Sequence, residues 1–211
     1  GEPRIDYKDN TDGALLLEPS RTNLFPQSNK FDTDWTLNNI TVTSGQTGVG
    51  GNSEAWKITA SSGIGEKKLN KNLLVSGNHA ISVYAKKGTR DYLWIRGVTG
   101  GTNKRTFFNL STGIIETDEA ISSQMIDMGD GWYRCTRTYI ATEINEPNTF
   151  VIGNSASDGS TAGPTVGEFI YLWGAMVSPG STIVKYIKTG ASASTHKERG
   201  ELSKTYYDGQ V

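Results

Sequence analysis

Residues 121–140 read ISSQMIDMGDGWYRCTRTYI, and this stretch decides the fold. Two runs rich in β-forming residues, 121–128 and 132–140, flank a Gly-Asp-Gly turn at 129–131. An Asp-Gly pair between apolar runs is a strong signal for a β-hairpin, because both residues tolerate the positive φ that tight turns need. The stretch therefore predicts two antiparallel strands joined by a short turn.

The same pattern extends along the whole chain. The 25 glycines gather with Asn, Ser, Thr and Asp in turn-like clusters, and runs rich in Val, Ile, Thr, Tyr, Phe and Trp lie between them. A second hairpin is expected at 110–114, and no segment holds an apolar 3.6-residue period for three turns. The pattern predicts an all-β jelly-roll sandwich of two antiparallel sheets. The predicted strands are 14–17, 40–43, 55–59, 80–86, 92–96, 105–110, 114–117, 121–128, 132–140, 148–153 and 168–177.

Composition narrows the range of partners. The chain has 211 residues, of which 35% are hydrophobic and 20% charged, enough for one buried core. Its 21 Lys+Arg and 22 Asp+Glu give a net charge of −1 without a basic cluster, which argues against nucleic acid as a partner. No apolar run is long enough to insert into a membrane. The single cysteine, Cys135, excludes an internal disulfide and a cysteine-based zinc site.

The sequence predicts one domain and a tail. We expect a single jelly-roll domain over 1–190, in which 1–24 form an extended segment and the first strand. The polar stretch 191–211 is expected to be a linker or an extension onto a neighbouring element. A first residue other than Met and the end at 208–211 indicate a piece of a longer protein.

Alternation along three predicted strands sorts side chains into two faces, because successive residues of a strand point to opposite sides of a sheet. The apolar alternate set is expected in the core, and it comprises Ile81, Val83, Ala85, Leu93, Ile95, Tyr133, Cys135 and Tyr139. The opposite set is expected on outer, solvent-facing surfaces, and it includes Tyr84, Lys86, Tyr92, Trp94, Arg96, Trp132 and Arg134.

Exposed aromatic rings beside hydrogen-bonding side chains suit a ligand with one apolar and one polar aspect, such as a sugar ring. We therefore predict a ligand-binding site composed of Tyr84, Lys86, Tyr92, Trp94, Arg96 and Arg134. The alternative is that these aromatics are cross-strand pairs, or are covered by loops or a second subunit. For Trp132 this alternative is favoured, and for Tyr92, Trp94 and Arg96 both interpretations stay open.

Sequence motifs of catalysis and metal binding are absent. The chain has no nucleophile elbow, zinc-protease helix, Walker loop or dinucleotide fingerprint, and its two histidines, His79 and His196, have no partner pattern. We expect no cofactor, although a structural Ca²⁺ would be compatible with a jelly roll. Trp173 lies in a run that is apolar on both faces, which predicts a core position, and Cys135 is expected to be a buried small hydrophobe.

Several segments in one order resemble a family of phage virion proteins. The N-terminal string Leu-Leu-Leu-Glu-Pro-Ser-Arg-Thr-Asn-Leu at 15–24 is similar to head-fibre, tail-fibre and tail-spike modules with a carbohydrate-binding-module-like jelly roll. The stretches 130–134, 172–175 and 185–190 follow in the order seen in that family. This sequence departs from the family at 175–178, where relatives usually have Gln and Glu after Gly-Ala. The resemblance implies a concanavalin A-like sandwich displayed on the virion surface, outside the cell.

Three functions fit these observations. The first is a non-catalytic module of a phage structural protein that binds a host-surface glycan or receptor. The second is a purely architectural virion domain that docks other virion proteins or forms a homo-oligomer, for example a trimer. The third, ranked lowest, is a glycan-degrading enzyme, because a carboxylate pair cannot be recognised from spacing along the sequence alone.

Overall fold

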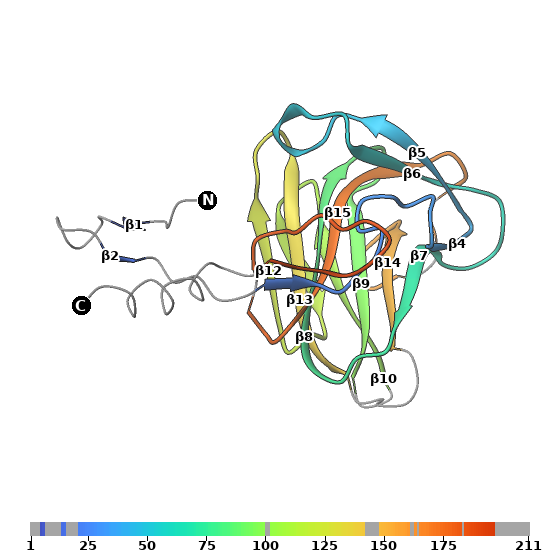
Figure 1. Cartoon of the computed structure of the whole chain (residues 1–211). Helices are drawn as coiled ribbons and strands as arrows, with labels where there is room; N and C mark the ends of the chain where they lie inside the picture. Colours follow the sequence, from blue (N-terminus) through green and yellow to red (C-terminus); the bar gives the residue numbers. More distant parts are fainter. Residues whose placement is uncertain are drawn as a thin grey trace, which may run out of the picture.

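Two β-sheets stacked face to face form the body of the protein, as seen in a computed structural model (Figure 1). The structure describes residues 5–6, 14–15, 21–99, 102–141, 148–160, 163, 165–182 and 184–196. Each large sheet has six strands, and all recorded strand pairs are antiparallel. The predicted all-β sandwich is therefore confirmed. No helix found among these residues is long and apolar enough to cross a membrane.

The first sheet, called the β9 sheet, has the strand order β11-β10-β9-β14-β7-β4. The second, called the β15 sheet, has the order β12-β13-β8-β15-β6-β5. The strands of the β9 sheet are β4 (Thr36–Asn38), β7 (Lys67–Leu73), β9 (Tyr92–Thr99), β10 (Thr102–Asn109), β11 (Ile114–Asp118) and β14 (Asn148–Ser155). Those of the β15 sheet are β5 (Ile40–Gln46), β6 (Ala55–Ala60), β8 (Gly77–Lys87), β12 (Ser122–Asp127), β13 (Trp132–Ala141) and β15 (Phe169–Pro179). The remaining elements are β1 (Ile5–Asp6), β2 (Ala14–Leu15), β3 (Arg21–Asn23), the 3-10 turn η1 (Val49–Gly51) and β16 (Ser194–His196).

Both predicted hairpins form. β12 pairs with β13 across a turn in which Gly129, Asp130 and Gly131 all have positive φ, between 52° and 82°. β10 pairs with β11, and the loop closes through a hydrogen bond from Gly113 N to Asn109 O. In both turns, glycine adopts the left-handed backbone that side chains disfavour.

The core lies between the sheets and contains the predicted apolar set. Seven of its members are fully or almost fully buried in one cluster, and Tyr133 packs against that cluster. Cys135 is buried as expected, and burial raises the pKa of its thiol well above the ordinary value. Aromatic residues of the loop before β4 close the core at one end, with Phe25 edge-on to Phe150 at 5.5 Å and Phe31 edge-on to Trp56 at 6.1 Å.

A buried arginine ties the two sheets together. Arg137 of β13 points into the sandwich, where its Nη1 donates hydrogen bonds to the carbonyls of Ile95 and Lys104 in the opposite sheet. Burial lowers the pKa of Arg137 to about 10, against the opposing effect of Asp118 and Glu119. The side chain is therefore a charged donor in the interior at neutral pH.

The sequence did not reveal β7, a strand inside the β9 sheet that reads KKLNKNL. Its inward side chains are Leu69, Leu73 and two lysines, and both lysines are buried. Lys67 donates to the carbonyls of Ser61 and Gly63 at 2.8 and 2.7 Å, and Lys71 donates to Pro26 O at 2.7 Å. Because backbone carbonyls satisfy both ammonium groups, a strand of polar composition can occupy this position.

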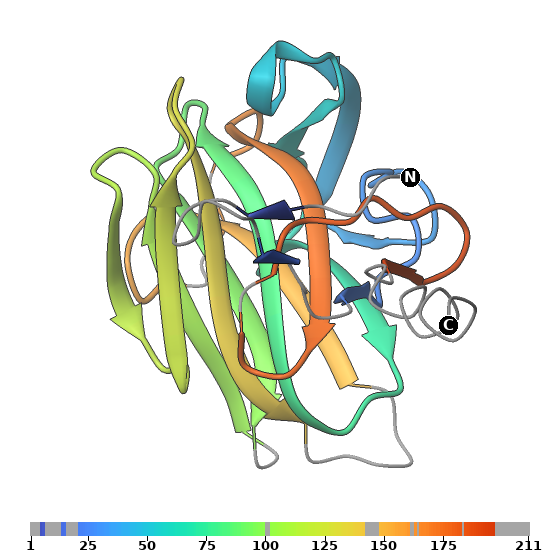
Figure 2. The same cartoon turned by 60° about the vertical axis from the view of Figure 1, so that its left-hand side comes forward.

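Residues after β15 return across the outer side of the β15 sheet and end beside the start of the sandwich (Figure 2). β16 pairs with β3, with Ser194 opposite Asn23 and His196 opposite Arg21. Ordered pairing thus continues beyond the domain boundary predicted at 190. Most of the predicted N-terminal segment 1–24 and the tail beyond 196 lie outside the described residues.

Candidate functional site

The six predicted site residues lie on two different surfaces. Tyr84 and Lys86 of β8 and Arg134 of β13 lie on the outer face of the β15 sheet, because Arg134 pairs with Tyr84 and their neighbours Val83 and Cys135 are in the core. Tyr92, Trp94 and Arg96 of β9 lie on the outer face of the opposite sheet, since Leu93 and Ile95 point inward. Alternation assigned the faces correctly, but the prediction of one common site for all six is wrong.

Trp94 does not face solvent, which corrects its predicted exposure. Its side chain is 0% exposed and packs with Phe107 and Val151 on neighbouring strands. Opposite it stands Gly153, where a Cβ would overlap the indole ring. The guanidinium groups of Arg96 and Arg105 lie over the same ring, at 5.9 and 5.4 Å from its centroid.

A carboxylate holds these guanidinium groups in place. Glu66 accepts a hydrogen bond from Arg105 Nη2 at 2.8 Å, pairs with Lys68, and lies 3.8 Å from Arg96 Nη1. Burial opposes ionisation of Glu66, but the hydrogen bonds from Lys68 and Arg105 and the charge of Arg96 keep its pKa below the ordinary value. This network covers Trp94, so Arg96 serves a packing role on this face.

Tyr92, nearer the edge of the same face, remains half-buried. Its hydroxyl donates to the Glu116 carboxylate at 3.3 Å and accepts from Asn109 Nδ2 at 3.3 Å. Burial and then the nearby Glu116 carboxylate raise the pKa of Tyr92. Both hydrogen-bonding functions of this hydroxyl are used within the protein.

On the β15 sheet, a segment after β15 covers two of the predicted residues. We call residues 184–190 the crossing segment (Figure 2). Tyr84 is 7% exposed and Arg134 is 8% exposed, so their expected exposure is also wrong. Tyr84 lies edge-on to Tyr186 of the crossing segment at 6.0 Å, and Arg134 donates to Val184 O and to Ser82 Oγ. Burial raises the pKa of Tyr84 and lowers that of Arg134.

The outer face of β15 carries aromatic side chains that keep part of their surface in solvent. Phe169, Tyr171 and Trp173 alternate along the strand, and all three are half-buried. Trp173 lies edge-on to Tyr84 at 4.8 Å and to Tyr186 at 4.9 Å. Tyr171, Trp173 and Tyr186 belong to one cluster that also contains the buried Tyr84 and Trp132. We call these five residues together the aromatic surface.

The predicted core position of Trp173 is therefore wrong. Leu172 is in the core opposite Ala85, and Trp173 pairs with Tyr84 on the outer face. The register then shifts between Trp173 and Met176, where Gly174 has a positive φ of 58°. This β-bulge returns Ala175 to the core, and it explains why apolar residues occupy consecutive positions. Glycine after Trp in an apolar strand is the sequence signal from which this bulge could have been predicted, although no bulge was predicted there.

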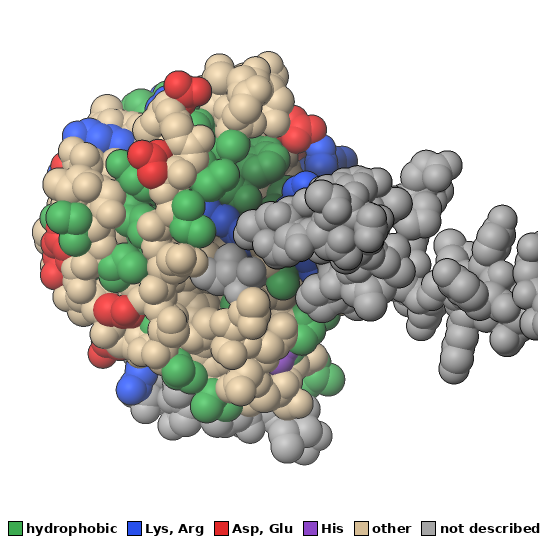
Figure 3. Space-filling view, turned by 90° about the vertical axis from the view of Figure 1, so that its left-hand side faces the viewer, with side chains coloured by type: hydrophobic (Ala, Val, Ile, Leu, Met, Phe, Trp, Pro, Cys, Tyr) green, Lys and Arg blue, Asp and Glu red, His purple; other side chains and the backbone are tan. Residues whose placement is uncertain are grey.

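Basic side chains accompany the aromatic surface. Lys57 Nζ lies 4.0 Å from the centroid of Phe169, and Lys86, the register partner of Tyr171, is half-buried. Hydrophobic side chains gather on the face seen in Figure 3, with basic groups beside them. Trp132 is 2% exposed, as the favoured interpretation predicted.

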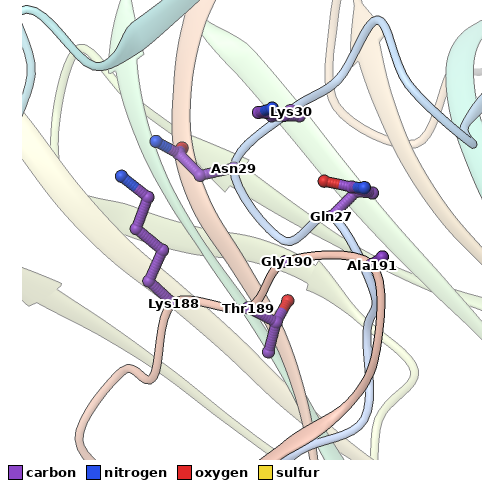
Figure 4. Close-up of a pocket in the computed structure, with 7 residues that line it drawn as sticks. All are labelled: Gln27, Asn29, Lys30, Lys188, Thr189, Gly190 and Ala191. Atoms are coloured by element: carbon purple, nitrogen blue, oxygen red, sulfur yellow. The ribbon is translucent and has the colours of Figure 1, made fainter.

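A pocket of about 450 Å³ opens between the loop before β4 and the end of the crossing segment (Figure 4). Its lining residues are Gln27, Asn29, Lys30, Lys188, Thr189, Gly190 and Ala191. Both charged side chains in this lining are basic, and Lys188 pairs with Glu54. The hydrogen bond from Lys188 lowers the pKa of Glu54.

Reciprocal hydrogen bonds fix the two walls of the pocket. Ser28 N donates to Thr189 Oγ1 at 3.1 Å, and Thr189 N donates to Ser28 Oγ at 2.9 Å. Ser28 Oγ also bonds to the Tyr186 hydroxyl at 2.8 Å. Asn29 joins the pocket to the aromatic surface, because its Oδ1 accepts from Gly174 N at 2.9 Å, directly after Trp173.

Among the residues that the structure describes, no group of three or more His, Cys, Asp or Glu side chains gathers to hold a metal ion. His79 is buried, bonds to Gly77 O at 3.0 Å and stacks on Tyr139. The side chain of His196 lies outside the described part of the structure.

No protein-family model matches the sequence, and no curated protein matches it. Three solved structures are similar to the chain at low identity. The enzymatically active domain of bacteriophage CBA120 tailspike protein 4 has 11% identity and a TM-score of 0.43, over 74% of this chain and 21% of that one. The second structure is that of the CBM22-1-GH10 modules of Clostridium thermocellum endo-1,4-β-D-xylanase 10B in complex with xylohexaose. It has 11% identity and a TM-score of 0.44, over 81% of this chain and 30% of that one.

The third structure is TmCBM61 in complex with β-1,4-galactotriose, with 10% identity and a TM-score of 0.45 over 74% of this chain and 97% of that one. This chain thus corresponds to under a third of the first two proteins and to nearly all of the third. At these identities the likeness concerns the arrangement of strands and does not extend to the side chains of a site.

Proposed function

We propose that this protein is a non-catalytic carbohydrate-binding module whose site is the aromatic surface of the β15 sheet. The observation that carries the proposal is the pair Tyr171 and Trp173, two half-buried rings that alternate on one outer face beside Lys57 and Lys86. Such rings would stack on the C–H face of a sugar, while the lysines would hydrogen-bond its hydroxyls.

The buried residues around this pair would keep it in position. Tyr84 supports Trp173 edge-on, and Arg134 fixes the backbone of the crossing segment above Tyr84. A binding surface whose side chains are already held in place loses less conformational entropy when its ligand binds. In this proposal Lys86 keeps its predicted contact role, whereas Tyr84 and Arg134 act as supports.

We propose no catalytic step, because the residues that define the aromatic surface include no carboxylate, the pocket lining includes none either, and the neighbouring Glu54 is engaged by Lys188. Glycoside hydrolysis would require a pair of free carboxyl groups at a set separation. The resemblance of 15–24 to phage fibre and tail-spike modules supports a place on the virion surface, where the ligand would be a host glycan. Other virion proteins would then be its structural partners.

A glycan array probed with the wild-type protein and two variants tests the site. We expect Trp173→Ala and Tyr171→Ala each to weaken binding by about 1 to 3 kcal/mol, the usual range for a central aromatic anchor. Tyr92→Ala is the matched control, because it removes a half-buried ring from the opposite sheet. Circular dichroism and thermal unfolding would show that each variant remains folded.

Three outcomes would overturn the proposal. Loss of binding in Tyr92→Ala alone would move the site to the β9 sheet. A stable oligomer in light scattering, together with no bound glycan, would favour the architectural function, with the aromatic surface as a protein interface. Release of reducing ends from a bound polysaccharide would show that the module is an enzyme.

A further inference from the structure

One residue of the pocket has a backbone conformation that its side chain disfavours. Gln27 has a φ of 51°, in the left-handed region where glycine is the favoured residue. Its N donates to Gly190 O at 2.6 Å, and its carbonyl accepts from Trp35 Nε1 at 3.0 Å and from Lys30 N at 3.1 Å. These bonds impose the conformation, so a glycine would meet every backbone requirement at this position. The glutamine side chain thus adds strain at this position without adding a backbone contact, which points to a role for the side chain itself.

The side chains lining the pocket differ in whether their polar groups are already used. Both polar atoms of the Asn29 side chain are engaged, since Oδ1 accepts from Gly174 N and Nδ2 donates to Glu54 O at 3.1 Å. Thr189 is likewise bonded to Ser28. By contrast, the Gln27 amide and the Lys30 ammonium have no side-chain partner within the described residues, and both line the opening (Figure 4).

We infer that this pocket binds a carboxylate-bearing sugar residue, a uronic or sialic acid, belonging to a glycan whose other rings lie on the aromatic surface. Lys30 would pair with the carboxylate, and the Gln27 amide would bond to the carboxylate or to a neighbouring hydroxyl. Asn29 sets the two regions side by side, because it bonds to the backbone next to Trp173. The inference rests on the proposed function and adds the class of ligand.

The test uses a glycan array in which each uronic- or sialic-acid oligosaccharide is printed beside its carboxyl-reduced form. We expect the wild-type protein to prefer the carboxylated form of the glycans that it binds. Lys30→Gln should weaken binding of the carboxylated form by about tenfold, as expected for the loss of one charge-assisted hydrogen bond. Binding of the carboxyl-reduced form should be unchanged. Lys185→Gln is the matched control, because Lys185 is an exposed lysine of the crossing segment outside the pocket lining.

The variant Gln27→Gly tests the inference in a second, independent way. It should lower binding of the carboxylated glycan while leaving the unfolding temperature unchanged or raised, because it removes the strained side chain and keeps the backbone bonds. A structural role for Gln27 would instead lower the unfolding temperature and leave the preference for carboxylated glycans intact.

The possible failures are distinguishable. The inference would be overturned if the wild-type protein bound the carboxylated and the carboxyl-reduced glycans equally. It would also be overturned if Lys30→Gln and Gln27→Gly kept the preference for the carboxylated form. Either result would leave the proposed function standing. Absence of binding to every glycan, neutral ones included, would overturn both.

Discussion

The indole of Trp94 occupies the space that a side chain at Gly153 would fill. The two residues are register partners on β9 and β14, and their outer face is closed by the guanidinium groups of Arg96 and Arg105. We therefore expect Gly153→Ala to destabilise the fold by about 1 to 3 kcal/mol, the usual cost of overpacking. Urea unfolding would measure this, with Gly190→Ala as the control, because a Cβ there meets open space.

Trp94 itself should matter for stability and not for ligand binding. Its side chain is wholly buried, so Trp94→Ala is expected to lower the free energy of unfolding by about 3 to 5 kcal/mol. Trp94→Phe, which keeps an aromatic ring, should cost less and leave glycan binding at the wild-type level. Weaker binding in a folded Trp94→Phe protein would contradict this.

Acid should weaken the network over Trp94. The pKa of Glu66 in the folded protein lies below its ordinary value of 4.5, so its ion pairs stabilise the fold above that pH. This contribution is lost as the pH falls through the folded pKa. The wild-type protein should exceed Glu66→Gln in free energy of unfolding by the largest amount near neutral pH, and this difference should shrink below about pH 4.5. Denaturant midpoints of both proteins, measured across this pH range, test the prediction. A difference between the two midpoints that does not change with pH would refute it.

Arg137 should be hard to replace, even by another cation. Lysine cannot reproduce the planar donor group that reaches both Ile95 O and Lys104 O, so Arg137→Lys is expected to cost about 1 to 3 kcal/mol. Arg90→Lys is the control: Arg90 pairs with Glu168 near the surface, where such a change should cost under about 1 kcal/mol. Equal costs in the two variants would contradict the role of Arg137 as a tie between the sheets.

The hydroxyl of Tyr186 should hold the crossing segment against the loop before β4. Tyr186→Phe keeps the ring against Trp173 but loses the bond to Ser28 Oγ, which should cost about 1 kcal/mol. Hydrogen exchange at Thr189 N, which donates to Ser28 Oγ, should become faster. Unchanged protection there would show that the other contacts of the segment suffice.

The sequence predicted the sandwich well because its strands obey simple rules. Alternation placed Ile81, Val83 and Leu93 in the core, and Gly-containing turns marked both hairpins. These rules failed where contacts with distant parts of the chain, and not the composition of the strand itself, decide which side chains are buried. β7 was missed because backbone carbonyls, invisible in the sequence, solvate its buried lysines.

The candidate site was predicted only in part. Alternation correctly put Trp94 and Tyr84 on outer faces, but an outer face is wet only if nothing covers it. Trp94 is covered by arginines from two strands, and Tyr84 by a segment about a hundred residues later in the chain. Trp173 was assigned to the core because its run is apolar on both faces, which is typical of a strand buried on both sides. The run is apolar on both faces because the bulge at Gly174 turns Ala175 inward and because Tyr171 and Trp173 are apolar residues of an outer face.

The pairing of β3 with β16 also has a mechanical consequence. Because Thr22 and Thr195 lie opposite each other, the chain enters and leaves the sandwich at a single point. A pull applied between the segments before 21 and after 196 would act first on this short ladder, and the load would not pass through the two large sheets. The two large sheets, with the aromatic surface, would thus stay folded while the segments on either side of the sandwich are under tension.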